Sequence, residues 1–176
     1  SWYGAAMAAG DMNGDGADEL AIGMHGHSSD DHTYAGAVVV FDGHHTLPLS
    51  SFSGHWQLAE SAEQQTYRFF GKVLEMGDLD GDGLADLVAG VPKYDLEGVR
   101  DAGIVEVQYG TAGASHRTAL LTLAPVAVPS QDDELGSALA IGDFDGDGDG
   151  DLVTGAPESD TPFDRQVGGA IVADLD

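Results

Sequence analysis

The chain has 176 residues, and its 31 Asp and Glu against 6 Lys and Arg give a formal net charge of −25. This charge excludes nucleic-acid binding by phosphate neutralisation and disfavours docking on an anionic membrane surface. Because the chain has no cysteine, disulfides, cysteine zinc sites and a cysteine nucleophile are also excluded. No apolar run approaches the roughly 18 residues that span a bilayer. The 42% hydrophobic content still predicts a folded core rather than an acidic disordered tail.

Three acidic, glycine-rich segments recur along the chain at intervals of 67 and 65 residues, measured between Asp11, Asp78 and Asp143. An aromatic residue or Leu, followed by Gly, precedes each segment by a similar distance. A short apolar run that ends in Gly follows each one, and a further apolar run begins about a dozen residues later. The similarity therefore extends well beyond the acidic residues and indicates a structural repeat.

Each repeat is predicted to form a strand, an acidic hairpin loop, a second strand, a longer loop and a third strand. The reason is that short runs rich in Val, Ile, Leu and Ala are bounded by Gly, Asp and Pro. A weaker fourth strand fits at 49–52 or 66–69 in the first repeat, and at 119–123 in the second. No long window has a convincing helical period, and the best helical candidate is 57–68.

Four short strands per repeat are typical of a β-propeller blade, in which radial repetition protects the sheet edges. We therefore predict an all-β fold of four-stranded antiparallel blades. Blade 1 would occupy 1–69, blade 2 would occupy 70–134, and blade 3, which is incomplete, would occupy 135–176. Three blades are fewer than the four to eight that usually close a ring. Since the chain begins Ser1-Trp2-Tyr3 without Met or a signal-peptide pattern, we expect a processed chain or a fragment.

The acidic loops place oxygen atoms at alternating positions, as a hard cation requires. Counted from the first Asp, positions 1, 3, 5 and 9 carry side-chain oxygens and position 7 offers a backbone carbonyl. Glycines at positions 4 and 6 let the chain turn with positive φ. Calcium accepts about six to eight oxygens in a flexible shell, whereas magnesium demands a near-ideal octahedron, so about three structural Ca²⁺ ions are predicted. The predicted ligands are Asp11, Asn13, Asp15, Ala17 and Glu19; Asp78, Asp80, Asp82, Leu84 and Asp86; and Asp143, Asp145, Asp147, Asp149 and Asp151.

Two other interpretations of the loops are weaker. An EF-hand needs a bidentate Glu at position 12, where these loops have Ile22, Ala89 and Thr154. Plain acidic turns would explain one loop, since Asp and Gly are common turn residues. They explain three loops at equivalent places poorly, because the clustered carboxylates would repel each other without a cation.

No catalytic motif is present, and we do not expect an enzyme. The chain has neither a G-x-S-x-G nucleophile elbow nor a phosphate-binding G-x-x-x-x-G-K-S/T loop. Six of the seven His residues lie between positions 25 and 55. The simplest interpretation is that they are solvated loop residues on an acidic surface. The alternative is a second site for a transition metal, which imidazole and carboxylate together would suit.

The motifs that flank the acidic loops resemble the FG-GAP repeats of integrin α-subunit propellers. Phe70-Gly71 and Gly155-Ala156-Pro157 match that pattern literally, whereas Gly23-Met24-His25 departs from it at the proline. Near matches occur at Tyr3-Gly4, Leu135-Gly136 and Gly90-Val91-Pro92. The resemblance covers nearly the whole chain. It implies a β-propeller, typically of seven blades, with calcium in the hairpin loop between the first two strands of a blade and a location outside the cell or at its surface.

The family resemblance implies several functions and does not choose among them. We expect a non-enzymatic, calcium-binding propeller segment that acts in extracellular adhesion or protein–protein assembly. One alternative is an accessory propeller of a secreted hydrolase or phospholipase. Another is a structural subunit of an extracellular filament or surface layer. In each case the expected partner is a protein or another copy of the chain, with no nucleic acid and no membrane insertion.

Overall fold

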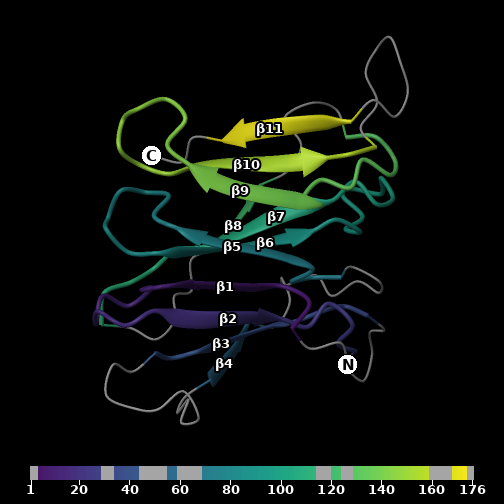
Figure 1. Cartoon of the computed structure of the whole chain (residues 1–176). Helices are drawn as coiled ribbons and strands as arrows, with labels where there is room; N and C mark the ends of the chain where they lie inside the picture. The colour runs from purple at the N-terminus through teal and green to yellow at the C-terminus, as the bar shows by residue number, and fades with distance from the viewer. Residues whose placement is uncertain are drawn as a thin grey trace.

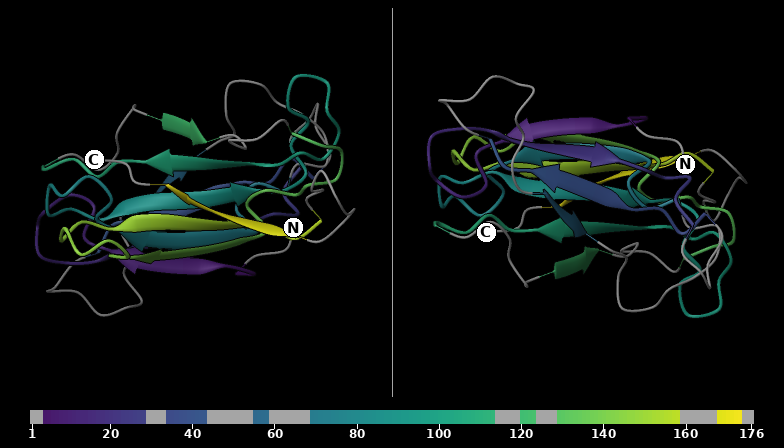
Figure 2. Two further views of the ribbon diagram at one scale, coloured as in Figure 1. Left: turned by 90° about the horizontal axis from the view of Figure 1, so that it is seen from above. Right: turned by 90° about the horizontal axis from the view of Figure 1, so that it is seen from below.

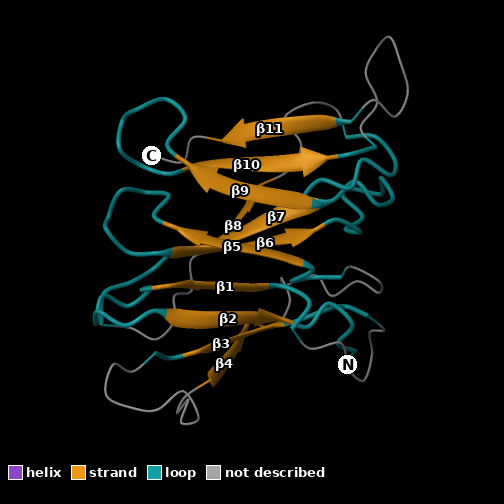
Figure 3. Ribbon diagram, viewed as in Figure 1, coloured by secondary structure: helices purple, strands orange, loops and turns teal. Residues whose placement is uncertain are grey.

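The computed structural model describes residues 4–28, 34–43, 55–58, 69–113, 120–123, 129–158 and 168–173. Within these ranges every regular element is a β-strand, as Figure 3 shows by colour. The strands form three antiparallel sheets, which confirms the predicted all-β fold. No helix in the described ranges has the length and apolar character that a membrane span requires.

Each sheet contains strands from one sequence repeat, paired in chain order. The first sheet has β1 (Met7–Gly10), β2 (Glu19–Gly23), β3 (Val38–Phe41) and β4 (His55–Leu58). The second has β5 (Val73–Gly77), β6 (Asp86–Val91), β7 (Ile104–Gln108) and β8 (Leu120–Leu123). The third has β9 (Ala138–Gly142), β10 (Asp151–Ala156) and β11 (Gly169–Ala173). This antiparallel meander is the strand arrangement of a propeller blade.

The fourth strands were predicted with mixed success. In the second sheet, β8 at Leu120–Leu123 agrees with the strand expected at 119–123. In the first sheet, β4 lies at 55–58 and pairs with β3, between the locations expected at 49–52 and 66–69. Residues 49–52, 59–65 and 66–68 lie outside the described residues. Gln57 and Leu58 belong to β4, which replaces the start of the helical candidate at 57–68. An outer strand is selected by its pairing with β3, and local propensity carries little of that information.

The sheets pack face to face, and two apolar clusters fill the spaces between them. Strand β1 lies beside β5, and β5 lies beside β9 (Figures 1 and 2). Neighbouring residues of β6 and β7 point to opposite sides: Ala89 and Ile104 pack toward the first sheet, while Val88 and Val105 pack toward the third. Because the middle sheet is covered on both faces, every residue of β6 and β7 is buried.

The start of each following sheet is hydrogen-bonded to the sheet before it. The N–H of Phe70 donates to the carbonyl of Ala35 at 3.1 Å, and the N–H of Leu135 donates to that of Ala102 at 3.0 Å. These are the Phe-Gly and Leu-Gly positions that the sequence repeats. The repeated aromatic or Leu residue is therefore part of the junction between sheets, and both Phe70 and Leu135 are buried there.

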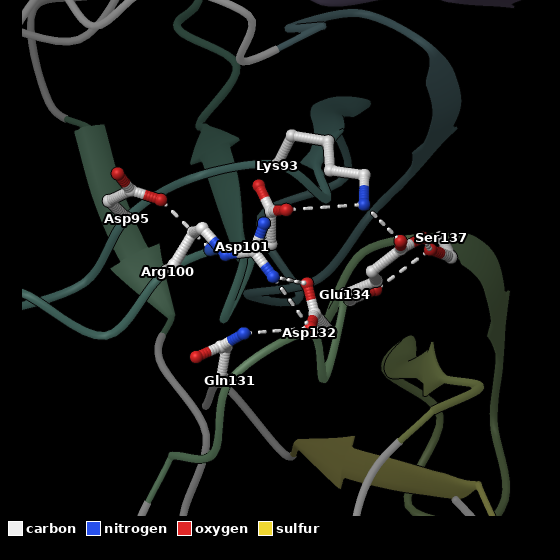
Figure 4. A network of polar contacts seen from close by, with 8 residues as sticks. All are labelled: Lys93, Asp95, Arg100, Asp101, Gln131, Asp132, Glu134 and Ser137. Carbon is white, nitrogen blue, oxygen red and sulfur yellow. Dashed lines mark hydrogen bonds and ion pairs between the residues drawn. The ribbon is translucent and has the colours of Figure 1, made fainter.

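A network of charged groups joins the second and third sheets at the edge opposite the acidic loops (Figure 4). The Lys93 ammonium contacts the Glu134 carboxylate and lies 3.4 Å from Asp101 Oδ2. Burial alone would lower the pKa of Lys93, but its contacts with Glu134 and Asp101 outweigh this effect and raise the pKa above its ordinary value. Nearby, Arg100 binds both carboxylate oxygens of Asp132, at 2.9 and 3.0 Å.

The equivalent junction between the first and second sheets has the same backbone and different side chains. Tyr34 and Phe69 occupy the places of Asp101 and Glu134, and all four residues have φ between 51° and 59°. The rings of Tyr34 and Phe69 pack with centroids 6.1 Å apart. The repeated geometry thus accepts either an aromatic pair or two carboxylates bridged by Lys93.

Two glycines are required where one sheet touches the next. A Cβ added to Gly23 would lie 2.0 Å from the carbonyl oxygen of Gly71, and one added to Gly90 would lie 2.1 Å from that of Gly136. Neither glycine has positive φ, so steric contact alone excludes a side chain. At the equivalent Gly155 the nearest atom, the Ala138 Cβ, is 3.4 Å away.

We therefore predict different outcomes for the same substitution in two repeats. Gly90→Ala should lower the free energy of unfolding by about 1–3 kcal/mol or more, because a backbone carbonyl must move. Gly155→Ala should change it by less than about 0.5 kcal/mol, as expected at an open position. Thermal melts of the two variants against the parent chain measure the difference. Equal destabilisation by both would contradict the packing described above.

Candidate metal centres

The three acidic loops connect the first two strands of each sheet and lie along one edge of the molecule, on the left in Figure 1. Each hairpin closes on the same register, with the residue at loop position 9 opposite a glycine. The closing pairs are Gly10 with Glu19, Gly77 with Asp86, and Gly142 with Asp151. Equivalent side chains are thus brought to equivalent places in the three sheets.

The carboxylate at position 9 is buried in every loop. Glu19 is 1% exposed, Asp86 0% and Asp151 7%. Each accepts a hydrogen bond from the N–H at position 2, from Met12 at 2.8 Å, Leu79 at 2.8 Å and Phe144 at 2.7 Å respectively. A buried charge requires such partners, because desolvation without them is costly.

The second carboxylate oxygen reaches the residue beyond the third strand. Gly43 donates its N–H to Glu19 Oε1 at 3.3 Å, and Gly110 donates to Asp86 Oδ1 at 2.8 Å. One side chain therefore holds both the hairpin loop and the end of the third strand. Sequence reasoning assigned these acids to a metal and missed this second, structural role.

Burial also changes the acidity of these groups. Desolvation raises the pKa of Asp86 to about 6, although the hydrogen bonds from Gly110 and Leu79 act in the opposite direction. Burial likewise raises the pKa of Glu19, against hydrogen bonds from Met12 and Gly43. Without a cation, part of the Asp86 population is therefore protonated near pH 6.

The second and third loops each bring three carboxylates together. The ligand atoms within each set lie within 4.8 Å of one another. Two unit charges at this distance repel by about 3 kcal/mol at an effective dielectric constant of 20, so a cation would relieve a substantial cost. The two clusters are Asp78, Asp80 and Asp86, and Asp143, Asp145 and Asp151.

The second loop fits a cation in a further respect. Oδ1 of Asp78 and Oδ1 of Asp80 are buried and have no hydrogen-bond partner. The other oxygen of Asp78 accepts the N–H of Gly83 at 2.9 Å, which fixes the side chain in place. Buried oxygens without donors are costly in an empty site and suit calcium, which binds oxygen ligands.

The carboxylates at loop position 5 were also predicted as ligands. Among the described residues, they lie outside the two clusters of three carboxylates. Asp82 Oδ1 accepts the N–H of Leu84 at 2.9 Å, and Asp147 Oδ1 accepts that of Asp149 at 3.0 Å. Asp15 does the same with Ala17 at 2.8 Å. These contacts are local turns of the Asx type, which Asp forms readily. The side chain at position 5 therefore stabilises the turn by accepting the N–H of position 7.

The first loop has a different internal arrangement. Asn13 donates from Nδ2 to Glu19 Oε1 at 3.0 Å, so an amide group lies where the other loops have a third carboxylate. Both oxygens of Asp11 already accept N–H groups, from Gly14 at 2.7 Å and Gly16 at 2.9 Å. Among the described residues, no cluster of three acids forms in this loop.

The loops are also hydrogen-bonded to one another. The N–H of Ala85, at position 8, donates to the position 1 carbonyl of Asp11 at 2.9 Å. The N–H of Gly150 donates in the same way to Asp78, also at 2.9 Å. A Cβ at Gly150 would lie 2.5 Å from the Asp78 oxygen. The small residue at position 8 was the only sequence signal of this contact.

The two histidines whose side chains are described, His25 and His27, give no support to the alternative transition-metal site. His25 is partly buried, with its ring centroid 6.2 Å from that of Phe69. Among the described residues, neither His25 nor His27 belongs to a group of side chains that could hold a metal ion together. His32, His44 and His45 lie outside the described residues.

Comparisons with known proteins agree with this geometry. A model of the FG-GAP repeat matches residues 3–41, 70–107 and 135–173. The chain is 31% identical over 175 residues to integrin alpha-PS2 of Drosophila melanogaster, covering 95% of this chain and 11% of that protein. It is 30% identical over 158 residues to the phosphatidylinositol-glycan-specific phospholipase D of Homo sapiens, covering 88% of this chain and 18% of the relative. It is 26% identical over 162 residues to integrin alpha-V of Gallus gallus, covering 89% and 14%. The chain therefore belongs to the FG-GAP repeat family, and its three sheets are β-propeller blades of that family.

Proposed function

We propose that the chain is a calcium-binding, non-enzymatic propeller segment whose ions hold the hairpin loops and the junctions between blades. The observation that carries this proposal is the second loop, where three carboxylates gather and two buried oxygens have no donor. Asp78, Asp80 and Asp86 would hold one ion, and Asp143, Asp145 and Asp151 a second. When bound, calcium supplies two positive charges and a flexible shell for oxygen ligands.

The first loop should bind more weakly than the other two. Asn13 and Glu19 are already joined by a hydrogen bond, which calcium would have to replace. Its acids are Asp11, Asp15 and Glu19, with the amide of Asn13 at position 3. We propose that this loop is partly stabilised by its own hydrogen bonds and takes a third ion with lower affinity.

Two observations, the relatives and the exposed surface, support a role in extracellular adhesion or protein assembly. The relatives are integrin alpha subunits and a phospholipase D, and the chain spans only 11–18% of their lengths. On the third blade, Phe144 and Val172 are both 60% exposed. Met12 and Leu79, which occupy the place of Phe144 in the other loops, are buried between blades. These features support a protein partner or self-association.

An accessory propeller in a secreted hydrolase or phospholipase is the second candidate. It is favoured by the similarity to phosphatidylinositol-glycan-specific phospholipase D, 30% for the human protein and 36% over 118 residues for that of Bos taurus. Mass spectrometry of the native protein would discriminate between the two. A hydrolase domain in the same polypeptide supports the accessory role, and its absence from the complete native protein contradicts it.

Calcium should raise the melting temperature of the chain. Extracellular calcium modules bind at about 10⁻⁴–10⁻³ M, and each site at ten times its dissociation constant adds about 1.4 kcal/mol. Two or three sites should therefore raise the melting temperature by about 5–15 °C between excess EGTA and calcium. The double variant Asp80→Asn with Asp145→Asn should lose most of this increase, whereas Glu97→Gln, outside the loops, should keep it. The same melt in EGTA and calcium would contradict the proposal.

The stability of the metal-free chain should decrease as the pH rises. Because burial raises the pKa of Asp86 from its ordinary value of 3.8 to about 6 in the folded state, the folded state holds a proton that the unfolded state releases in this window. The free energy of unfolding in EGTA should therefore fall by about 2–3 kcal/mol from pH 4 to pH 7. Since calcium binds the carboxylate, its stabilising effect should be larger at pH 7 than at pH 5.

Denaturant unfolding at several pH values measures this dependence, with Asp86→Asn as the control. The control should have a flatter profile in EGTA between pH 4 and pH 7, since its side chain does not titrate. A parent chain in EGTA that becomes more stable across this range would contradict the prediction.

A further inference from the structure

The third acidic loop lies directly against the second. Gly150 donates its N–H to the carbonyl of Asp78 at 2.9 Å. Beside it, the Asp149 carboxylate lies over Gly81: a Cβ on this glycine would be 2.6 Å from Oδ1 and 2.7 Å from Oδ2 of Asp149. A carboxylate from one blade thus contacts the backbone of the calcium loop in the preceding blade.

The same contact between the first and second loops is made by an apolar side chain. Ala85 donates its N–H to the carbonyl of Asp11, as Gly150 does to Asp78. Beside Ala85, the Cδ2 of Leu84 lies 3.1 Å from the place of a Cβ on Gly14. In both junctions the residue at position 7 therefore covers the glycine at position 4 of the preceding loop.

The covered loops differ in their internal hydrogen bonds. In the first loop, which Leu84 covers, Gly14 donates its N–H to Asp11 Oδ1 at 2.7 Å. In the third loop, where no atom lies within 4 Å of a Cβ placed on Gly146, this glycine donates to Asp143 Oδ1 at 2.6 Å. In the second loop the corresponding oxygen, Asp78 Oδ1, is buried and accepts no hydrogen bond. The second loop thus combines two features: a carboxylate lies over its Gly81, and its Asp78 Oδ1 lacks a hydrogen-bond donor.

We propose that Asp149 is a positioning residue for calcium in the second loop. Its carboxylate lies over Gly81, whose N–H does not donate to Asp78 Oδ1, and this leaves that oxygen available to the cation. Its negative charge also adds to the field at the Asp78, Asp80 and Asp86 cluster from the neighbouring blade. Calcium in the second loop is therefore coupled to the docking of the third blade. This inference rests on the proposed calcium function of the loops.

The contact can be tested without calcium. In the metal-free full chain, the protons of Gly81 should show nuclear Overhauser effects to the side chain of Asp149 by NMR. Asp149→Leu copies the residue that the second loop itself uses at position 7, so the junction should still pack. The Gly81 N–H should then donate to Asp78 Oδ1 as Gly14 does to Asp11 Oδ1, which shifts the Gly81 amide proton resonance. A Gly81 amide with the same shift in the parent chain and in Asp149→Leu would overturn the inference.

The effect on calcium is measured loop by loop. Calcium titrations followed through the amide resonances of Gly83 and Gly146 report the second and third loops separately. Asp149→Leu should weaken binding in the second loop by about tenfold, the usual cost of losing a group that orients a metal ligand. Asp149→Asn, which keeps the size and polarity of the side chain without its charge, should weaken it less. Binding in the third loop should stay within about twofold, because the backbone carbonyl at 149 is retained.

The outcomes separate this inference from the function on which it rests. If calcium does not bind the second loop of the parent chain, the proposed calcium function fails there. If calcium binds the parent chain and Asp149→Leu binds equally tightly in the second loop, only the role of Asp149 is overturned. The reciprocal variant Leu84→Asp, which places a carboxylate over Gly14, should strengthen calcium binding in the first loop; no change there would also count against the inference.

Discussion

A buried carboxylate at the end of each acidic loop connects three parts of every blade. It accepts the N–H at loop position 2 and, in the first two blades, the N–H that follows the third strand. Burying a charge is costly unless its oxygens are satisfied, so the hairpin, the third strand and the loop must take up their native places together. Desolvation that these hydrogen bonds do not fully offset raises the pKa of Asp86. A proton or a cation relieves that cost, and near neutral pH a cation is the effective choice.

The same loops join one blade to the next, which gives the proposed ions a role beyond their own turn. The carbonyl at position 1 of a loop accepts an N–H from position 8 of the following loop. A ligand residue such as Asp78 therefore contributes its carboxylate to the candidate site and its backbone to the junction. Loss of the ion would loosen both, so we expect calcium to affect the stability of the whole chain rather than of single hairpins.

At the opposite edge, the junctions show how far side chains can vary on a repeated backbone. Tyr34 and Phe69 pack their rings together, whereas Asp101 and Glu134 at the equivalent places are held by Lys93. The chain has only 6 Lys and Arg, so the placement of Lys93 and of Arg100 in one junction is a considerable share of its positive charge. The backbone contacts around glycine, and not a fixed set of side chains, define the junction.

The sequence by itself determined the number of repeats, the hairpin loops and the inner three strands of each blade, because these depend on local patterns of apolar residues, Gly and Asp. It did not locate β4, whose place is set by pairing with β3 across a long connection. Nor did it show that Asp82 and Asp147 accept N–H groups within their own turns, or that Asn13 donates a hydrogen bond to Glu19. The spacing of the residues alone does not decide which oxygen accepts an N–H and which remains available to a cation. Only the tertiary structure, which brings Asp149 over Gly81 of another repeat, decided how the loops influence one another, because residues that are distant in sequence interact only once the blades are packed.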